Sequence, residues 1–142
     1  MKGRNLFLLA LLLLVAGCPR RTAVWVEEGS TREHLVFRVS DERGSDHPLA
    51  IWYVRVDRFV PESQTYEIMW GFSFATSPPE MTRVEYGVVP HGAKSMVPSE
   101  AGAPLLAPGC YQAYTDGTGR SVFEVEAGGV VRELDRDSCE MR

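Results

Sequence analysis

Hydrophobic and polar residues alternate with a period of two along most of the chain after residue 22. Four segments, HLVFRVS, IWYVRVD, YEIMWGFSF and TRVEYGVV, show this alternation. Their predicted hydrophobic sides are, in the same order, Leu35, Phe37 and Val39; Trp52, Val54 and Val56; Tyr66, Ile68, Trp70, Phe72 and Phe74; and Val84, Tyr86 and Val88. This alternation is typical of antiparallel sheets with one face packed on a core and the other polar. No window longer than ten residues in this part keeps a helical stripe, so the pattern predicts an all-β protein.

Four aromatic residues are predicted to share one side of a strand: Tyr66, Trp70, Phe72 and Phe74. Such a side is either a platform for a sugar or a lipid, or one wall of the core. The core interpretation is favoured because a β-sandwich must bury side chains of this size.

Turn sequences separate the predicted strands. SPPE (77–80), TDGTGR (115–120) and AGG (127–129) are typical of turns. The last two predict a meander of strands over residues 111–115, 121–126 and 130–134. Seven or eight short strands in about 110 residues favour an antiparallel two-sheet sandwich. A small closed β-barrel is the alternative.

The segment LLAPGCYQAY, residues 105–114, joins a leucine and a Pro-Gly turn to a tyrosine at the start of a late strand. It resembles the tyrosine corner of immunoglobulin-like and fibronectin type III domains. The resemblance covers about ten residues, and the Cys–Trp–Cys spacing of antibody domains is missing. It implies an immunoglobulin-like form of the sandwich.

The first 17 residues have the features of an export signal. Lys2 and Arg4 precede an uninterrupted hydrophobic run of eleven residues, 6–16. A membrane-spanning helix needs about 20 hydrophobic residues. The run is therefore interpreted as the hydrophobic region of a secretory signal.

Val15, Ala16, Gly17 and Cys18 resemble the bacterial lipobox, a small apolar triplet followed by an invariant cysteine. The resemblance implies removal of residues 1–17. Cys18 then becomes the N-terminus, with its thiol linked to diacylglycerol and its amine open to a fatty acid such as palmitate. A plain secretory signal is the alternative. Pro19, in place of the Asp associated with inner-membrane retention, favours the periplasmic side of an outer membrane where the cell has one.

The chain has three cysteines, and an odd cysteine in an exported protein needs an explanation. If Cys18 carries lipid, Cys110 and Cys139 remain as one pair for a disulfide in an oxidising compartment. In a three-stranded meander these two positions would lie at opposite ends of the sheet, about 17 Å apart. Residues 135–138 must then double back along the sheet or cross to the other one.

The mature chain is acidic and forms one domain. Without Lys2 and Arg4 it has 13 basic and 19 acidic residues, a net charge of −6, and no basic stripe. This balance argues against nucleic acid as a partner. Residues 18–22 are interpreted as the lipidated cysteine and a short tether, and residues 23–142 as a single β-sandwich domain.

No segment of the sequence has a recognisable catalytic or metal-binding pattern. DGTG (116–119) occurs once and lies where a hairpin turn is needed. His34, His47 and His91 have no metal-ligand spacing, and neither remaining cysteine belongs to a Cys-x-x-Cys motif. His47 lies in an acidic segment that lacks the alternating ligands of an EF-hand. We therefore predict no catalytic residue, no metal ligand and no cofactor.

Residues 90–109 interrupt the strand pattern with four prolines and three glycines. A long irregular loop of this kind is often a working surface. His91, Lys94 and Met96 are its candidate binding residues. A plain crossover between the two sheets is the alternative.

Two functional hypotheses follow. The favoured one is a non-enzymatic, lipid-anchored envelope protein with a binding or scaffolding role, whose partners are the membrane and an envelope protein or a glycan. The alternative is an envelope hydrolase or ligand-processing enzyme whose site is assembled in three dimensions. A cleft that holds His34, His47 or His91 beside carboxylates would favour the enzyme.

Overall fold

A computed structural model describes residues 20–97 and 102–141, and all regular structure in these ranges is β. The strands are β1 (Ala23–Val26), β2 (Val36–Ser40), β3 (Leu49–Ala50), β4 (Tyr53–Val60), β5 (Thr65–Ser73), β6 (Glu80–Met81), β7 (Arg83–Glu85), β8 (Lys94–Ser95), β9 (Gly109–Thr115), β10 (Arg120–Val125) and β11 (Val131–Leu134). Within the described ranges, no helix is long and apolar enough to cross a membrane. The predicted signal and Cys18 lie outside these ranges.

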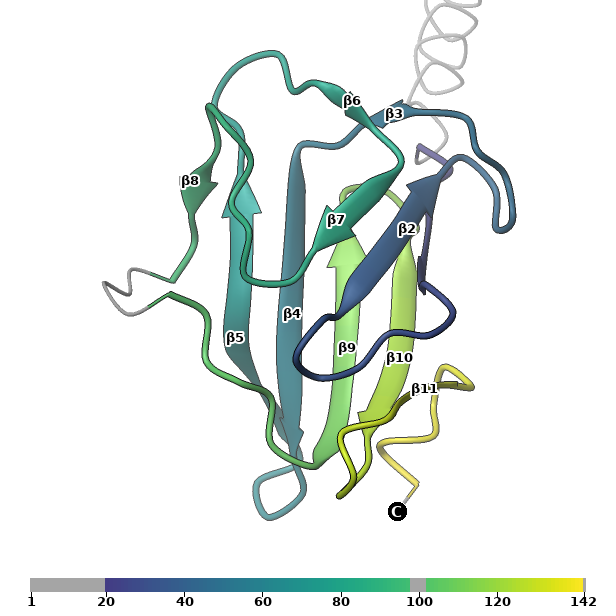
Figure 1. The fold of residues 1–142 in the computed structure, drawn as a ribbon, viewed down its shortest axis with the longest axis vertical. Coiled ribbons are helices and arrows are strands. Elements are labelled where there is room, and N and C mark those ends of the chain that lie inside the picture. Colours follow the sequence, from purple (N-terminus) through teal and green to yellow (C-terminus); the bar gives the residue numbers. More distant parts are fainter. Residues whose placement is uncertain (1–19, 98–101, 142) are drawn as a thin grey trace, which may run out of the picture.

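The strands form a two-sheet sandwich (Figure 1). A three-stranded sheet has the order β1-β2-β7, and a six-stranded sheet has the order β11-β10-β9-β4-β5-β8; β3 and β6 form a separate pair. All pairings are antiparallel. The strand order is that of an immunoglobulin-like sandwich, in which β1, β2 and β7 take the places of strands A, B and E. No described sheet closes into a barrel, so the predicted sandwich is confirmed.

Hydrophobic side chains from both sheets meet in one core. Phe37 of β2 lies 5.6 Å from Phe123 of β10 between ring centroids, and Tyr111 of β9 stacks on Phe123 at 5.5 Å. The predicted hydrophobic side of β2 is confirmed, because Leu35, Phe37 and Val39 are all buried. The core joins the sheets as the alternation requires.

A β-bulge in β5 changes which side chains face the core. Val56 pairs with Trp70, but the next pair is Asp57 with Ile68, so Met69 is the extra residue. One extra residue moves the following side chains to the opposite face. Trp70, with Phe72 and Phe74, is buried in the core, whereas Ile68 is 46% exposed and Tyr66 packs on a second cluster. The prediction that all five share one side is therefore wrong at Tyr66 and Ile68.

Two other predicted hydrophobic sides end early. Trp52 precedes β4 and is 44% exposed, while its neighbour Ile51 is buried. Val88 is 52% exposed because β7 ends at Glu85, and Gly87, with φ of 87°, turns the chain. The alternation applies only while the chain stays in a strand.

The disulfide between Cys110 and Cys139 is confirmed, with Cα atoms 5.8 Å apart. The expected 17 Å separation is wrong. Leu134, the last residue of β11, pairs with Val122 of β10, and Val122 pairs with Gln112 of β9. Strand β11 therefore ends level with Gln112, only two residues along β9 from Cys110. The tail doubles back and buries Cys139 in a cluster on the outer face of the six-stranded sheet.

The segment that resembles a tyrosine corner has the hydrogen bond of that motif. The Tyr111 hydroxyl donates to the carbonyl oxygen of Ala107 at 2.7 Å. Leu106 is fully buried beside it in the core. The bond fastens the chain that enters β9 to the strand it becomes.

Candidate functional site

The first described residues are fastened to the turn between β9 and β10. The Thr22 hydroxyl donates to the Asp116 carbonyl at 2.8 Å and accepts from the Gly119 N–H at 2.7 Å. The Thr118 hydroxyl accepts from the Thr22 N–H at 3.2 Å and donates to the Thr22 carbonyl at 3.1 Å. Thr22 is 5% exposed. Residues 20–22, predicted as part of a tether, therefore lie against the folded domain.

The DGTG sequence forms the hairpin turn that was predicted, and its glycines allow this contact. Gly117 has φ of 84°, and a Cβ atom there would lie 2.3 Å from the Arg20 carbonyl oxygen. The Asp116 carboxylate accepts from the Trp52 N–H at 2.8 Å and lies 3.5 Å from the Arg20 guanidinium. Asp116 thus joins the β9–β10 turn to the start of the chain and to the residue before β4.

The candidate residues His91, Lys94 and Met96 lie in different local settings. His91 is exposed in a turn, and Lys94 belongs to β8, where it pairs with Ser73. Met96 N–H donates to the Gly71 carbonyl at 2.9 Å. The first part of the predicted loop is therefore an edge strand of the six-stranded sheet, and residues 98–101 lie outside the described ranges.

The other end of that segment is also tied to the sandwich. The Tyr86 hydroxyl donates to the Pro104 carbonyl at 2.8 Å. Burial raises the pKa of this tyrosine well above its usual value. A cavity of about 130 Å³ beside Trp70 and Ala103 lies under the segment. It is too small for a typical drug-sized ligand.

The three histidines lie apart on the surface. His34 Nδ1 is 3.3 Å from a Glu85 carboxylate oxygen, and His47 Nδ1 is 3.8 Å from Asp41, with all four side chains exposed. Together with His91 they share no cleft among the cavities of the described chain. In the described ranges, no three His, Cys, Asp or Glu side chains gather as a metal site.

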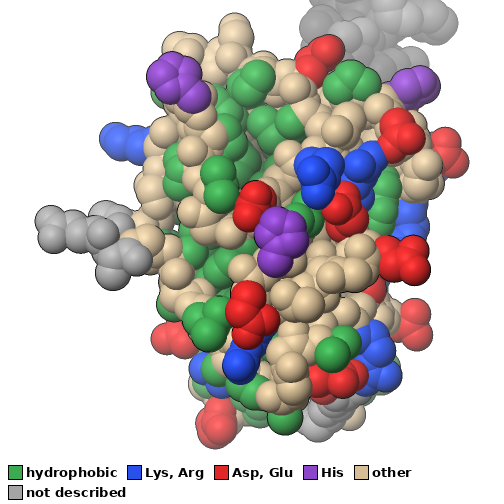
Figure 2. Space-filling view, in the orientation of Figure 1, with side chains coloured by type: hydrophobic (Ala, Val, Ile, Leu, Met, Phe, Trp, Pro, Cys, Tyr) green, Lys and Arg blue, Asp and Glu red, His purple; other side chains and the backbone are tan. Residues whose placement is uncertain are grey.

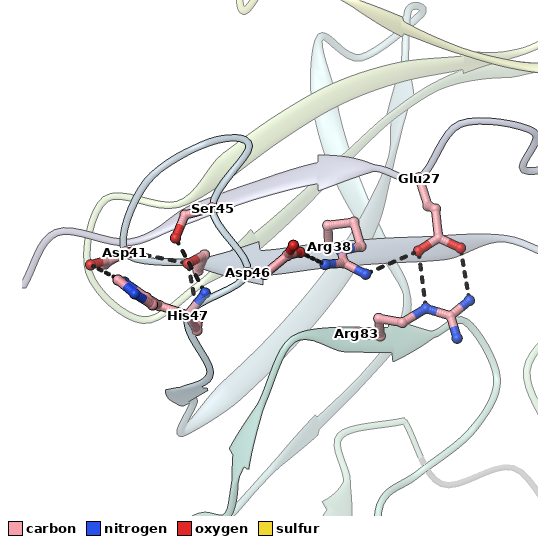
Figure 3. Close-up of polar contacts among 8 residues, drawn as sticks. Glu27, Arg38, Asp41, Ser45, Asp46, His47 and Arg83 are labelled. Atoms are coloured by element: carbon pink, nitrogen blue, oxygen red, sulfur yellow. Dashed lines mark hydrogen bonds and ion pairs between the residues drawn. The ribbon is translucent and has the colours of Figure 1, made fainter.

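Charged side chains cover the outer face of the three-stranded sheet. Arg83 donates two hydrogen bonds to Glu27, at 3.0 and 2.7 Å, and Arg38 lies between Glu27 and Asp46 (Figure 3). The bond from Arg83 lowers the pKa of Glu27. Figure 2 shows acidic and basic groups interspersed over this side. The four charges balance, so this face is a solvated surface rather than a site for one sign of charge.

A buried carboxylate lies on the outer face of the six-stranded sheet. Asp57 of β4 is 1% exposed, and its Oδ2 accepts from Gln112 at 3.2 Å, from the Tyr114 hydroxyl at 3.2 Å and from Arg55 at 3.0 Å. Burial raises the pKa of Asp57, although the bonds from Gln112 and Arg55 oppose the shift. Raised carboxyl pKa values often mark general acids. Here the side chains of its partners cover the carboxylate, so it cross-links β4 and β9 instead.

A cleft of about 670 Å³ opens between β1 and the β10–β11 pair. Arg43, from the β2–β3 loop, reaches across to Glu133 of β11 with contacts of 3.0 and 2.5 Å. The Ser121 hydroxyl donates to the same carboxylate at 2.7 Å. Arg120 and Arg136 also line the cleft. It is therefore a polar groove, bridged at one point by an ion pair.

The cleft separates two free strand edges. β1 pairs only with β2 and β11 only with β10 among the described strands. Because the Glu27 N–H donates to the Val36 carbonyl, the antiparallel alternation turns the backbone groups of Val24 and Val26 away from β2. Val24 lines the groove, so the unpaired edge of β1 forms one of its sides.

Sequence reasoning missed this groove, the Thr22 junction and the Asp57 network. Each depends on residues that are far apart in the chain. The signal available in the sequence was weak: a threonine before the first strand, and an aspartate among valines in YVRVDRFV.

Comparison of the chain with models of protein families, with curated proteins and with solved structures finds no match.

Proposed function

We propose that the chain is a lipid-anchored protein of the bacterial envelope whose β-sandwich acts as a non-enzymatic binding or scaffolding domain. The cysteine pairing carries the proposal. Cys110 and Cys139 lie at bonding distance, so Cys18 is the one cysteine without a disulfide partner. It follows directly on the lipobox-like triplet, and acylation accounts for the odd cysteine. A lipoprotein with Pro19 belongs on the periplasmic side of an outer membrane where the cell has one.

The groove between β1 and β11 supports a binding role. Free strand edges pair with extended segments of other chains through backbone hydrogen bonds. Val24, whose peptide groups point away from β2, lines one side of the groove. An extended segment of another envelope protein is the partner that this groove fits.

The positions of the histidines support binding over hydrolysis. A hydrolase that uses histidine as its base would bring a histidine and carboxylates into one cleft. His34 and His47 instead form exposed pairs with single acids, and His91 lies in a turn. The groove at β1 is lined by arginines, acids and serines and contains no histidine.

The anchor is tested by expressing the full chain with a labelled fatty acid and measuring the intact mass of the membrane-extracted protein. We expect label and diacylglycerol mass on Cys18, and loss of both in Cys18→Ser. A matched control, Cys110→Ala with Cys139→Ala, should keep the lipid. Two or more acyl chains give stable anchoring, at about 0.8 kcal/mol per buried methylene. Cleavage at another residue with no added lipid would contradict the proposal.

A further inference from the structure

The described chain starts at the same end of the sandwich as the turn between β9 and β10. Arg20 lies against Gly117, and the Thr22 hydroxyl binds Asp116 and Gly119 of that turn. Figure 1 places this start, together with β3 and β6, at one end of the molecule, and the C-terminus at the other. The anchor of the proposed lipoprotein therefore leaves the domain from a defined end.

The distance from this end to the lipid is short. Two peptide steps separate Cys18 from Arg20, and they span at most about 7 Å when extended. The headgroup layer of one leaflet is about 5–8 Å thick, from the difference between the whole bilayer and its hydrocarbon core. Because Thr22 is held by the turn, the chain cannot be lengthened by peeling residues 20–22 off the domain without breaking buried hydrogen bonds. The end of the sandwich must then lie at the headgroups.

Trp52 is a large hydrophobic side chain at that end, and it is 44% exposed. The last β4–β9 pair is Val54 with Thr115, so Trp52 lies beyond it, level with the turn. The backbone N–H of Trp52 donates to the Asp116 carboxylate, which also lies 3.5 Å from Arg20. The Phe74 N–H donates to the Trp52 carbonyl at 2.8 Å, so residues 75–79 continue outward from there.

One segment of the surface near Trp52, residues 75–79, has no charged side chain. Residues 75–79 are Ala, Thr, Ser, Pro and Pro, and all but Pro78 are exposed. Acidic residues at this end include Asp41, Glu42 and Asp46 of the β2–β3 loop, Glu80 of β6 and Asp116 of the β9–β10 turn. Anionic headgroups repel these acidic residues, so the domain contacts the membrane through the indole ring of Trp52 and the tether rather than through charge. Trp is enriched at membrane interfaces, where its ring is apolar and its N–H stays hydrated.

We propose that the end of the sandwich formed by Trp52 and residues 75–79 lies on the membrane surface, with the Trp52 ring among the lipid headgroups. The proposal rests on the anchor at Cys18 proposed above. In this orientation, the strands run away from the bilayer, and the groove between β1 and β11 opens to the side. The 61–64 turn and the C-terminus then lie at the far end.

The three tryptophans of the chain report on three depths. Trp52 lies at the proposed contact, Trp70 is buried in the core, and Trp25 is three residues beyond Thr22 on β1, about 10 Å farther along a strand. Variants that keep one tryptophan each, with phenylalanine at the other two positions, separate their signals. The lipidated full chain is reconstituted in phosphatidylethanolamine–phosphatidylglycerol vesicles that contain phospholipids brominated near the headgroup.

We expect the emission of Trp52 to shift to the blue and to be lost in the brominated vesicles. The loss should be smaller for Trp25 and absent for Trp70, and high salt should leave the order unchanged. If the variants that carry Trp70→Phe do not fold, the quenching by brominated lipid is compared between the unmodified chain and the single variant Trp52→Phe. The difference in quenching is the contribution of Trp52, whose side chain is half exposed and outside the core.

Two results would overturn the inference, and they are distinguishable. If the protein floats with the vesicles but Trp52 is quenched no more than Trp70, or less than Trp25, the orientation is wrong and the anchor stands. If the protein does not float and Cys18 is unmodified, the anchor is wrong and the orientation falls with it.

Discussion

Replacement of Thr22 by valine tests whether the junction with the β9–β10 turn is part of the fold. Valine has almost the same shape as threonine, so Thr22→Val removes the hydroxyl without leaving a cavity. In the folded protein, that hydroxyl accepts from the Gly119 N–H at 2.7 Å and donates to the Asp116 carbonyl at 2.8 Å. The hydroxyl of Thr115, 3.3 Å from Thr22, also donates to that carbonyl at 3.2 Å.

The magnitude follows from which of these groups is left without a partner. The Asp116 carbonyl keeps the bond from Thr115, but the buried Gly119 N–H loses the acceptor that Thr22 supplied. A buried donor without a partner costs about 1–3 kcal/mol, and the lost bond adds about 1 kcal/mol. We therefore expect Thr22→Val to lower the free energy of unfolding by about 2–4 kcal/mol.

The assay is urea unfolding of residues 18–142 carrying Cys18→Ser, followed by tryptophan fluorescence. The midpoint should fall by roughly 1–2 M with an unchanged m value. Thr118→Val is the matched control: Thr118 also bonds Thr22, but its side chain is exposed and both bonds are only partly buried, so the loss of stability should be clearly smaller than that of Thr22→Val. An equal effect of the two substitutions, or no effect of Thr22→Val, would refute the reasoning.

Three further predictions concern the core, the buried carboxylate and the tail. Cys110→Ala with Cys139→Ala should lower the free energy of unfolding by about 3–4 kcal/mol through the loop that the disulfide closes; quantitative thiol labelling of the unreduced, denatured protein would contradict the bond. Burial raises the pKa of Asp57 in the folded protein, so the contribution of Asp57 to stability is fully present below the usual pKa of Asp and falls as pH rises through the folded pKa. The stability of the unmodified chain relative to Asp57→Asn should therefore fall over that pH range. Titration of the Asp57 carboxyl below the usual Asp range, measured by NMR, would contradict this prediction. Gly71→Ala should cost about 1–3 kcal/mol, because the new Cβ would lie 2.7 Å from a β4 carbonyl oxygen, whereas Gly128→Ala has open space and should be neutral; equal melting temperatures of these two variants would show that β4 and β5 yield.

Much of the fold was predictable because it depends on neighbours in the chain. The alternation of Leu35, Phe37 and Val39 predicted the buried side of β2, since successive side chains of a strand point to opposite faces. The meander of β9, β10 and β11 followed from two turn sequences, and the pairing of Cys110 with Cys139 from counting cysteines. These features require no knowledge of which distant residues come together.

The sites depended on tertiary contacts. Nothing in YEIMWGFSF marks Met69 as the extra residue, because a bulge is set by the partner strand β4. Asp57 stands on the predicted polar side, yet Gln112 and Tyr114, more than 50 residues away, bury it. The hydrogen bonds that hold Thr22 likewise come from a turn 94–97 residues away in the sequence. The sequence by itself determined the strands and turns, whose patterns are local; the junction at Thr22 and the groove were decided by tertiary structure, because long-range packing chooses which polar groups meet.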